Sequence, residues 1–185
     1  MNELPISMQE ANRFQLAFQD MRDARGYLMA ILELESKHDS ESLEHFFMAT
    51  EGLFIAALVC YSRSFVDSKS DGHAIPLIGI KNSQMFANQK GLKSLHHKVL
   101  ERRQKAAAHS DWEFHQTDLV DDGYPGALRR HPRPHYRRDI DIADFFALVD
   151  HVGQFCLHKG FELDEENRTT YPDLVGKVGV VRGNK

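Results

Sequence analysis

The sequence predicts an all-α protein: a four-helix bundle with a small β-hairpin or irregular arm between the third and fourth long helices. Four long stretches repeat apolar residues at steps of three, four and seven, which is the spacing of an amphipathic helix. The segment before the last stretch changes to short alternation interrupted by turn residues. With 185 residues, of which 42% are hydrophobic and 27% charged, the chain has the composition of one globular domain.

Two long helices are expected in the first third of the chain. The first covers residues 7–36, and Ser7 is a candidate N-cap at its start. The second covers residues 41–67, with a broad apolar face that includes Phe47. A segment that contains glycine and proline then interrupts the helical pattern.

Three further helices are expected to complete the fold. A short helix is predicted near residues 82–88, a third long helix at 92–109 and a fourth at 140–163. We assign residues 1–168 to the helical domain. The remaining residues, 169–185, are expected to form a loosely ordered C-terminal tail because apolar periodicity has ended there.

The predicted arm concentrates arginine, although the formal net charge of the chain is −4. WEFHQTDLV alternates as a strand does, DDGYPG is a turn signal, and ALRRHPRPHY follows. The arm holds five candidate RNA-binding residues that can contact phosphates, namely Arg129, Arg130, Arg133, Arg137 and Arg138. Two alternatives are a solvated hairpin whose charges discourage edge pairing, and a surface for an acidic protein partner.

The compartment is expected to be the cytoplasm. The N-terminal residues MNELPISMQEANRF lack a basic segment followed by an apolar one, so no signal peptide is expected. No apolar run approaches the roughly 20 residues of a membrane helix, so no membrane association is expected. Cys60 and Cys156 lie in apolar helical patterns and are expected to be buried free thiols.

The segment RRQKAAAHSDWEF, at the end of the third predicted long helix, contains the candidate catalytic residues Arg102, Arg103 and His109. On a helix that turns about 100° per residue, positions seven apart fall within roughly 20° of each other, and positions six apart diverge by roughly 120°. Arg102 is therefore expected to share a face with His109. Ser110 and Asp111 follow directly and are candidates for orienting the imidazole.

An arginine and a histidine together suit RNA cleavage without a metal ion. Histidine can take the proton of a ribose 2′-hydroxyl, or protonate the leaving 5′-oxygen, near neutral pH. Arginine can hold the scissile phosphate and stabilise the charge that develops on it. The structural alternative is that both residue types simply favour the negative end of the helix dipole.

Two sequence segments resemble the HEPN superfamily (higher eukaryotes and prokaryotes nucleotide-binding), in particular its abortive-infection-type proteins. ERRQKAAAHSD is similar to their arginine and histidine motif, and LVCYSRSFVD is similar to a segment that these proteins carry near the end of their second helix. His109 matches the histidine of that motif. Arg103 matches its arginine with five intervening residues and Arg102 with six, so the choice between them stays open.

The resemblance implies a HEPN-like bundle that forms a homodimer through its motif helices, with two sets of catalytic residues in one cleft. It further implies a metal-independent endoribonuclease without a cofactor, acting as a toxin or phage-defence effector. An antitoxin partner of nucleotidyltransferase type is the implied restraint. Some members of the superfamily are not nucleases, so the alternative is a non-catalytic HEPN-like module that binds RNA, a nucleotide or a protein.

Two further candidates lie outside the motif. Arg63 either supports the phosphate site or pairs with an acid such as Asp67 or Glu101, and the structural role is the stronger expectation. His96 and His97 are adjacent, so on a helix they point about 100° apart and do not readily share one ion. No metal site is therefore expected.

Overall fold

The computed structural model describes residues 5–37, 43–65, 82–107, 117–119, 128–130 and 139–174. The long helices are α1 (Ile6–Lys37), α2 (Leu43–Arg63), α4 (Lys90–Ala107) and α5 (Ile142–Thr170). The shorter elements are α3 (Asn82–Met85), β1 (Thr117–Leu119) and β2 (Leu128–Arg130). The four long helices pack as a bundle, which confirms the all-α bundle expected from the sequence.

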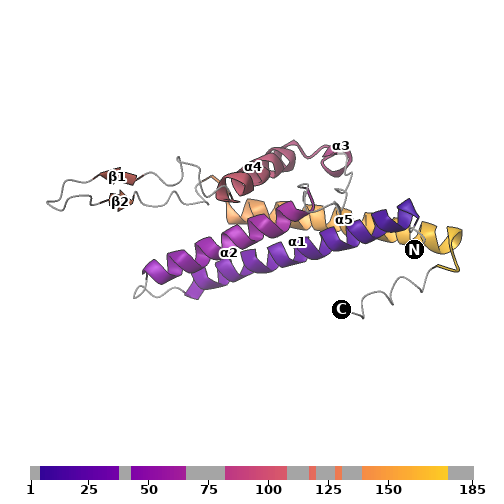
Figure 1. The fold of residues 1–185 in the computed structure, drawn as a ribbon, viewed down its shortest axis with the longest axis horizontal. Coiled ribbons are helices and arrows are strands. Elements are labelled where there is room, and N and C mark those ends of the chain that lie inside the picture. Colours follow the sequence, from indigo (N-terminus) through magenta and orange to yellow (C-terminus); the bar gives the residue numbers. More distant parts are fainter. Residues whose placement is uncertain are drawn as a thin grey trace.

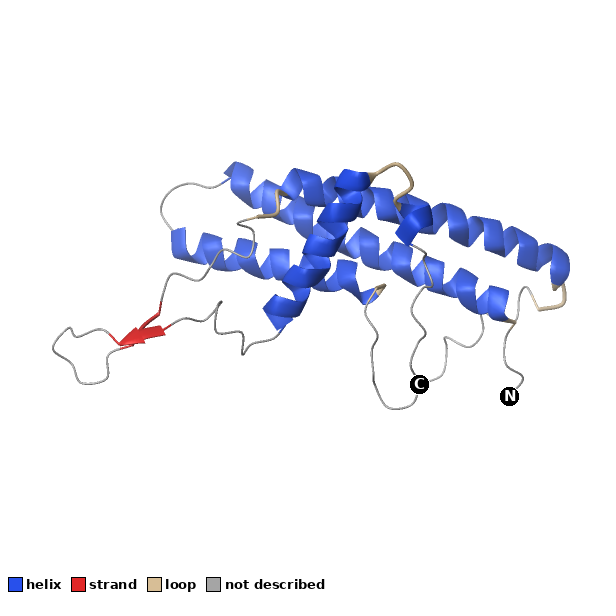
Figure 2. Cartoon of the chain, turned by 90° about the horizontal axis from the view of Figure 1, so that it is seen from above, coloured by secondary structure: helices blue, strands red, loops and turns tan. Residues whose placement is uncertain are grey.

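The helices α1 and α5 form the main helix pair of the bundle, and α2 packs along α1 (Figure 1). The contact between α1 and α5 is the most extensive in the molecule, followed by that between α1 and α2. The helix α4 lies on one side of these three and contacts α2 and α5. Seen from above, it crosses the other long helices obliquely (Figure 2).

The core lies where α1, α2 and α5 meet and extends under α4. Its largest fully buried side chains are aromatic or aliphatic, apart from one histidine on α4, and they include Phe54, Tyr61, Phe145, Met21 and His96. The Phe145 ring meets those of Phe54 and Tyr61 edge to face, with ring centroids 5.9 and 5.6 Å apart. Cys60 and Cys156 are buried free thiols, as expected.

Both ends of α5 differ from the predicted range 140–163. Asp141 caps the helix, because its carboxylate accepts hydrogen bonds from the backbone amides of Ala143 and Asp144 at 2.8 and 3.2 Å. The C-terminal end lies seven residues later than predicted, at Thr170. Apolar periodicity does end near residue 163, but α5 continues because its polar side chains contact α1.

The added turns of α5 are held by interhelical hydrogen bonds. Ser7 donates from its hydroxyl to Oδ1 of the buried Asn167 at 2.6 Å. Because α1 begins at Ile6, Ser7 lies inside the helix and is not the predicted N-cap. Gln15 donates to Asp164 at 2.8 Å. The predicted tail therefore begins within an ordered helix, and residues 175–185 lie outside the described residues.

The C-terminal end of α2 comes earlier than residue 67. The helix stops at Arg63, and the backbone amide of Phe65 donates to the carbonyl of Ser62 at 2.9 Å, which is the tighter bonding of a closing turn. At the other end Phe47 is 47% exposed, so it does not belong to the buried face predicted for this helix.

The helix α2 is also the most apolar of the long helices. Its segment Phe46–Arg63, with mean hydropathy 1.3 over 18 residues, meets the length and composition of a membrane span, contrary to the expectation from the sequence. In the bundle its residues Phe54, Leu58 and Tyr61 are fully buried. A core helix satisfies the same two criteria, so they do not distinguish the two roles.

The other elements follow the predicted order. Three helices, α1, α3 and α4, begin and end within three residues of the segments predicted for them. Between α4 and α5, β1 and β2 pair antiparallel, with Thr117 opposite Arg130 and Leu119 opposite Leu128.

Truncating Phe145 to alanine is expected to lower the free energy of unfolding by about 3–5 kcal/mol, because a fully buried aromatic ring leaves a cavity between α5 and α2. Phe161, on the same helix, is 64% exposed, and Phe161→Ala is expected to change stability by less than about 0.5 kcal/mol. Urea denaturation followed by circular dichroism measures both. Equal losses would contradict the described orientation of α5.

Candidate functional site

The two candidate arginines of α4 occupy different positions relative to the core. His96, Val99 and Arg103 follow the spacing of one helical face, and the first two are fully buried. Arg103 is partly buried at the end of this face, and Arg102 lies beside it. His109, with which Arg102 is expected to share a face, lies outside the described residues, as do Ser110 and Asp111.

Arg102 is engaged with the start of α5. Its Nη2 atom lies 2.5 Å from Oδ2 of Asp139, and the Arg102 side chain is only 13% exposed. Lys98, one turn earlier, donates from Nζ to the backbone carbonyl of the same Asp139. Asp139 therefore joins α4 to the N-terminus of α5 through two basic side chains, and its carboxylate offsets the charge of Arg102.

Arg103 differs from Arg102 in one respect that matters for chemistry. Its Nε atom is buried, and within the described part of the chain it donates no hydrogen bond. Buried polar atoms are nearly always satisfied, and an unsatisfied donor costs about 1–3 kcal/mol, so each exception calls for an explanation. Arg103 also forms no ion pair with an acid among the described residues, and an unpaired guanidinium is suited to bind an oxyanion such as phosphate through its terminal N–H groups.

His96 contributes a polar group to the core. Its Nδ1 atom and the hydroxyl of Tyr61 on α2 share a hydrogen bond of 2.8 Å, and the rings of Phe65 and Phe86 pack against it with centroids 4.7 and 5.0 Å away. Burial, and to a lesser degree the neighbouring His97, lowers the pKa of His96 from the usual 6.5 to about 4. Burial also raises the pKa of the Tyr61 hydroxyl well above its usual range. Both groups are therefore neutral near pH 7 and join α2 to α4.

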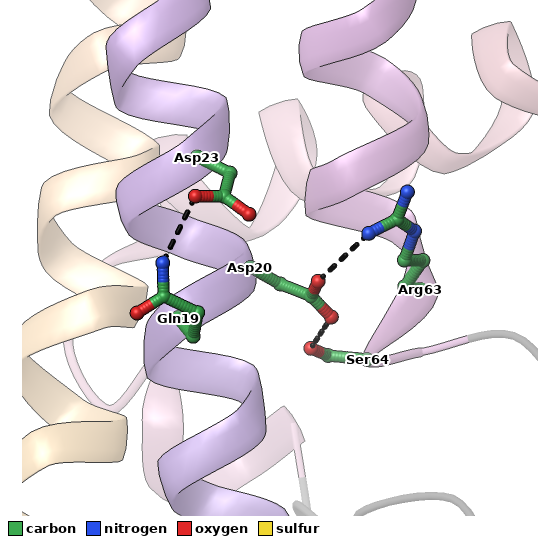
Figure 3. A network of polar contacts seen from close by, with 5 residues as sticks. All are labelled: Gln19, Asp20, Asp23, Arg63 and Ser64. Carbon is green, nitrogen blue, oxygen red and sulfur yellow. Dashed lines mark hydrogen bonds and ion pairs between the residues drawn. The ribbon is translucent and has the colours of Figure 1, made fainter. Parts of the chain in front are cut away.

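Arg63 pairs with an acid that the sequence analysis did not name. Its guanidinium lies 3.3 Å from Oδ1 of Asp20 on α1, while the hydroxyl of Ser64 lies 3.5 Å from the other oxygen (Figure 3). Of the two partners expected from the sequence, Glu101 is not the acid in this pair, and Asp67 lies outside the described residues. Beside this pair, Gln19 donates to Asp23 at 3.0 Å.

The environment of Asp20 favours a structural role for Arg63. Burial raises the pKa of the Asp20 carboxyl, while Arg63 opposes that shift through its charge and its hydrogen bond. Arg63 itself is 57% exposed, so this pair contributes modestly to stability. It fixes the end of α2 against α1, and within the described residues it does not contact Arg102 or Arg103.

The structure covers the remaining candidates only in part. Arg129 and Arg130 lie on β2, with Arg129 opposite Asp118 in the strand register. Arg133, Arg137 and Arg138 lie outside the described residues. Among the described residues, no group of three or more histidine, cysteine, aspartate or glutamate side chains is arranged to hold a metal ion.

Sequence reasoning missed Asp139 and Tyr61, the residues that hold α4 in place. Asp139 lies directly after the arginine-rich segment and two residues before the cap of α5. A single acidic residue next to two arginines was the feature of the sequence that could have indicated an ion pair. Tyr61 falls on the broad apolar face predicted for residues 41–67, so its hydroxyl gives no signal in the sequence. A single sequence does not reveal that its hydroxyl meets a histidine 35 residues away.

Replacing His96 with glutamine is expected to reduce the pH dependence of stability. The folded state keeps the ring neutral down to about pH 4 while the unfolded state binds a proton below about pH 6.5, so stability is lost as pH falls through that window. Between about pH 6.5 and pH 5 this amounts to about 2 kcal/mol for the wild type and is absent from His96→Gln.

The measurement is urea denaturation at several pH values. His97, exposed on the same helix, contributes only the smaller part of the shift at His96, so His97→Gln is expected to retain most of the wild-type pH dependence. An unchanged pH profile in His96→Gln would show that this ring is not kept neutral by folding.

A double-mutant cycle tests the link between Arg102 and Asp139. Arg102→Ala and Asp139→Ala are each expected to lower the free energy of unfolding, with a coupling energy of about 0.5–1 kcal/mol, because one partner is half-exposed. Additive losses in denaturation experiments would mean that the ion pair does not hold α4 to α5.

Comparisons with known proteins add no relative from which a site can be transferred. No family model, no curated protein and no solved structure matches the chain. The function is therefore argued from the residues of this chain and their geometry.

Proposed function

We propose that this protein is a metal-independent endoribonuclease of HEPN type that acts through Arg103 and His109. The observation that carries the proposal is that Arg103, near the end of α4 in the RRQKAAAHSD segment, has no ion-pair partner and no hydrogen-bond partner for Nε among the described residues. The ordered bundle supplies a rigid support for this arginine, since His96 and Val99 anchor the same face of α4 in the core.

The choice between the two arginines follows from their partners. Arg102 is bound to Asp139, so its charge is already offset inside the molecule. Arg103 has no such ion pair within the described residues, so no carboxylate there offsets its charge. Arg103 is therefore proposed as the residue that binds the scissile phosphate, and Arg102 as the residue that positions the end of α4.

The proposed reaction is an internal transesterification. His109 removes the proton of the ribose 2′-hydroxyl, the 2′-oxygen attacks phosphorus, and the bond to the 5′-oxygen breaks. A second histidine, supplied by the partner subunit of a homodimer, protonates the leaving oxygen. The products carry a 2′,3′-cyclic phosphate and a 5′-hydroxyl. Arg103 stabilises the charge that builds on the phosphate oxygens in the transition state.

The biological setting is proposed from the resemblance alone. A HEPN-like ribonuclease of this kind would serve as a cytoplasmic toxin or phage-defence effector, restrained by an antitoxin of nucleotidyltransferase type. Arg129, Arg130, Arg133, Arg137 and Arg138 are proposed to contribute phosphate contacts from the arm, with Ser110 and Asp111 orienting the catalytic imidazole.

A second function is favoured by a different observation. The engagement of Arg102 with Asp139 is what a stable, non-catalytic module would show at this position. Such a HEPN-like module would bind RNA, a nucleotide or a protein partner without cleaving it. The two functions differ in a direct way, because only the first requires His109 for turnover.

Cleavage of a labelled mixed RNA pool distinguishes the two functions. The wild type is expected to cleave in the presence of EDTA, and His109→Ala to lose at least about 100-fold in rate because the acid and base are removed. Arg103→Ala is expected to lose a comparable factor. Arg22→Ala, an exposed arginine on α1, provides the matched control and should retain wild-type activity.

Circular dichroism of every variant separates loss of activity from loss of folding. Abolition of cleavage by EDTA would contradict the metal-independent mechanism. Binding of RNA by folded wild-type protein without any cleavage would favour the non-catalytic module.

A further inference from the structure

The charges of this protein are divided between its helices. The chain as a whole has a formal net charge of −4. The helix α4 nevertheless carries six lysine or arginine residues and one acidic residue, Glu101. By contrast, α5 carries six acidic and two basic residues. A positive helix in a negative molecule is not explained by the overall composition, and it creates a local attraction for anions.

The basic side chains of α4 lie on two sides of the helix. Arg102 and Arg103 lie beside the core-facing side, as described above. Lys90, Lys93 and His97 are exposed and follow one another at steps of three and four, so they share one side of the helix, roughly 120° around its axis from the face of His96 and Val99. The exposed Glu101 follows His97 by one turn on the same side. We call these three residues the α4 outer face.

The lysines of the α4 outer face are uncommitted within the described residues. No salt bridge or side-chain hydrogen bond holds Lys90 or Lys93 there, whereas Lys37 and Lys159 on other helices pair with Glu33 and Glu162. Pairing would reduce the attraction that a lysine exerts on an external anion. No acid in the described part of the chain pairs with either lysine, so both can attract an anion from solution.

The placement of α4 leaves this face accessible. The helix lies across one side of the bundle, and its contacts with α2 and α5 involve the face that carries His96 and Val99 (Figures 1 and 2). An 18-residue helix is about 27 Å long, which is enough to follow several consecutive phosphates of an extended strand. The C-terminal end of the same helix carries Arg103.

We propose that the α4 outer face binds the sugar-phosphate backbone of single-stranded RNA and leads the strand along the helix toward Arg103. Charge complementarity favours a polyanion, and the two lysines of this face are suited to contact phosphates, which position a strand without reading its bases. The proposal rests on the proposed function for the identity of the ligand and extends it by placing a second, non-catalytic part of the binding surface.

The test is a binding measurement by fluorescence anisotropy with a labelled single-stranded RNA of mixed sequence. The background is the full chain with His109→Ala, so that the RNA stays intact. Adding Lys90→Glu and Lys93→Glu is expected to weaken binding at least about tenfold at moderate salt. The slope of log K against log salt concentration is expected to fall in magnitude by about 1.4, which corresponds to two phosphate contacts on a single strand.

The matched control makes the same change in net charge elsewhere. Arg22→Glu and Arg168→Glu alter exposed residues on α1 and α5, and this pair is expected to change the dissociation constant less than about twofold. Equal weakening by the two pairs would overturn the proposal, because only total charge would then matter. So would an unchanged salt slope. Lys90→Gln and Lys93→Gln replace the charge-reversed pair if circular dichroism shows unfolding.

The outcomes separate this inference from the proposed nuclease. Loss of RNA binding in the lysine variants, together with no cleavage by the wild type, would support the α4 outer face and reject the nuclease. Cleavage by the wild type, together with RNA binding and cleavage unchanged by the lysine substitutions, would support the nuclease and reject the α4 outer face. Absence of RNA binding by the folded chain would reject this face as an RNA surface.

Discussion

The close packing of α1 against α5 is the constraint on which the other parts of the structure depend. Gly153 and Gly160 lie seven residues apart on α5, and both face α1. A β-carbon added at these glycines would meet the β-carbons of Met21 at 3.4 Å and of Phe14 at 3.6 Å. The two helices therefore approach until little space is left between them, and van der Waals contact extends along their length. The helix α2 packs against α1 of this pair, and α4 packs against α5.

The attachment of α4 is different in kind from that of α1 to α5. It relies on a small number of specific contacts: the buried pair of His96 with Tyr61, the packing of Val99, and the link from Arg102 to Asp139. Burying a polar pair costs desolvation free energy, and the hydrogen bond that offsets this cost forms in one geometry. The pair therefore specifies the orientation of α4 on the core. The orientation of α4 in turn decides the position of Arg103.

That orientation gives α4 two faces with different roles in the proposed function. The face toward the bundle ends in the partly buried Arg103, where the low dielectric would strengthen an interaction with phosphate. The face toward solvent carries lysines, whose attraction for RNA would be weaker per contact and sensitive to salt. Catalysis by a few residues and binding by many would then be separated on one helix. The neighbouring α5 is acidic and would not compete for the strand.

Local periodicity and composition determined much of this protein from the sequence alone. The sequence predicted four long helices, with the limits of α1 correct to one residue, because apolar spacing directly reflects the side of a helix that is buried. It also singled out Arg102 and Arg103 as the candidates on α4. Only the tertiary structure decided what distinguishes them, because an ion pair with Asp139 joins residues 37 positions apart. The same reason explains the partner of Arg63 and the C-terminal limit of α5: both depend on α1, and contacts between distant helices leave no periodic signal in the chain.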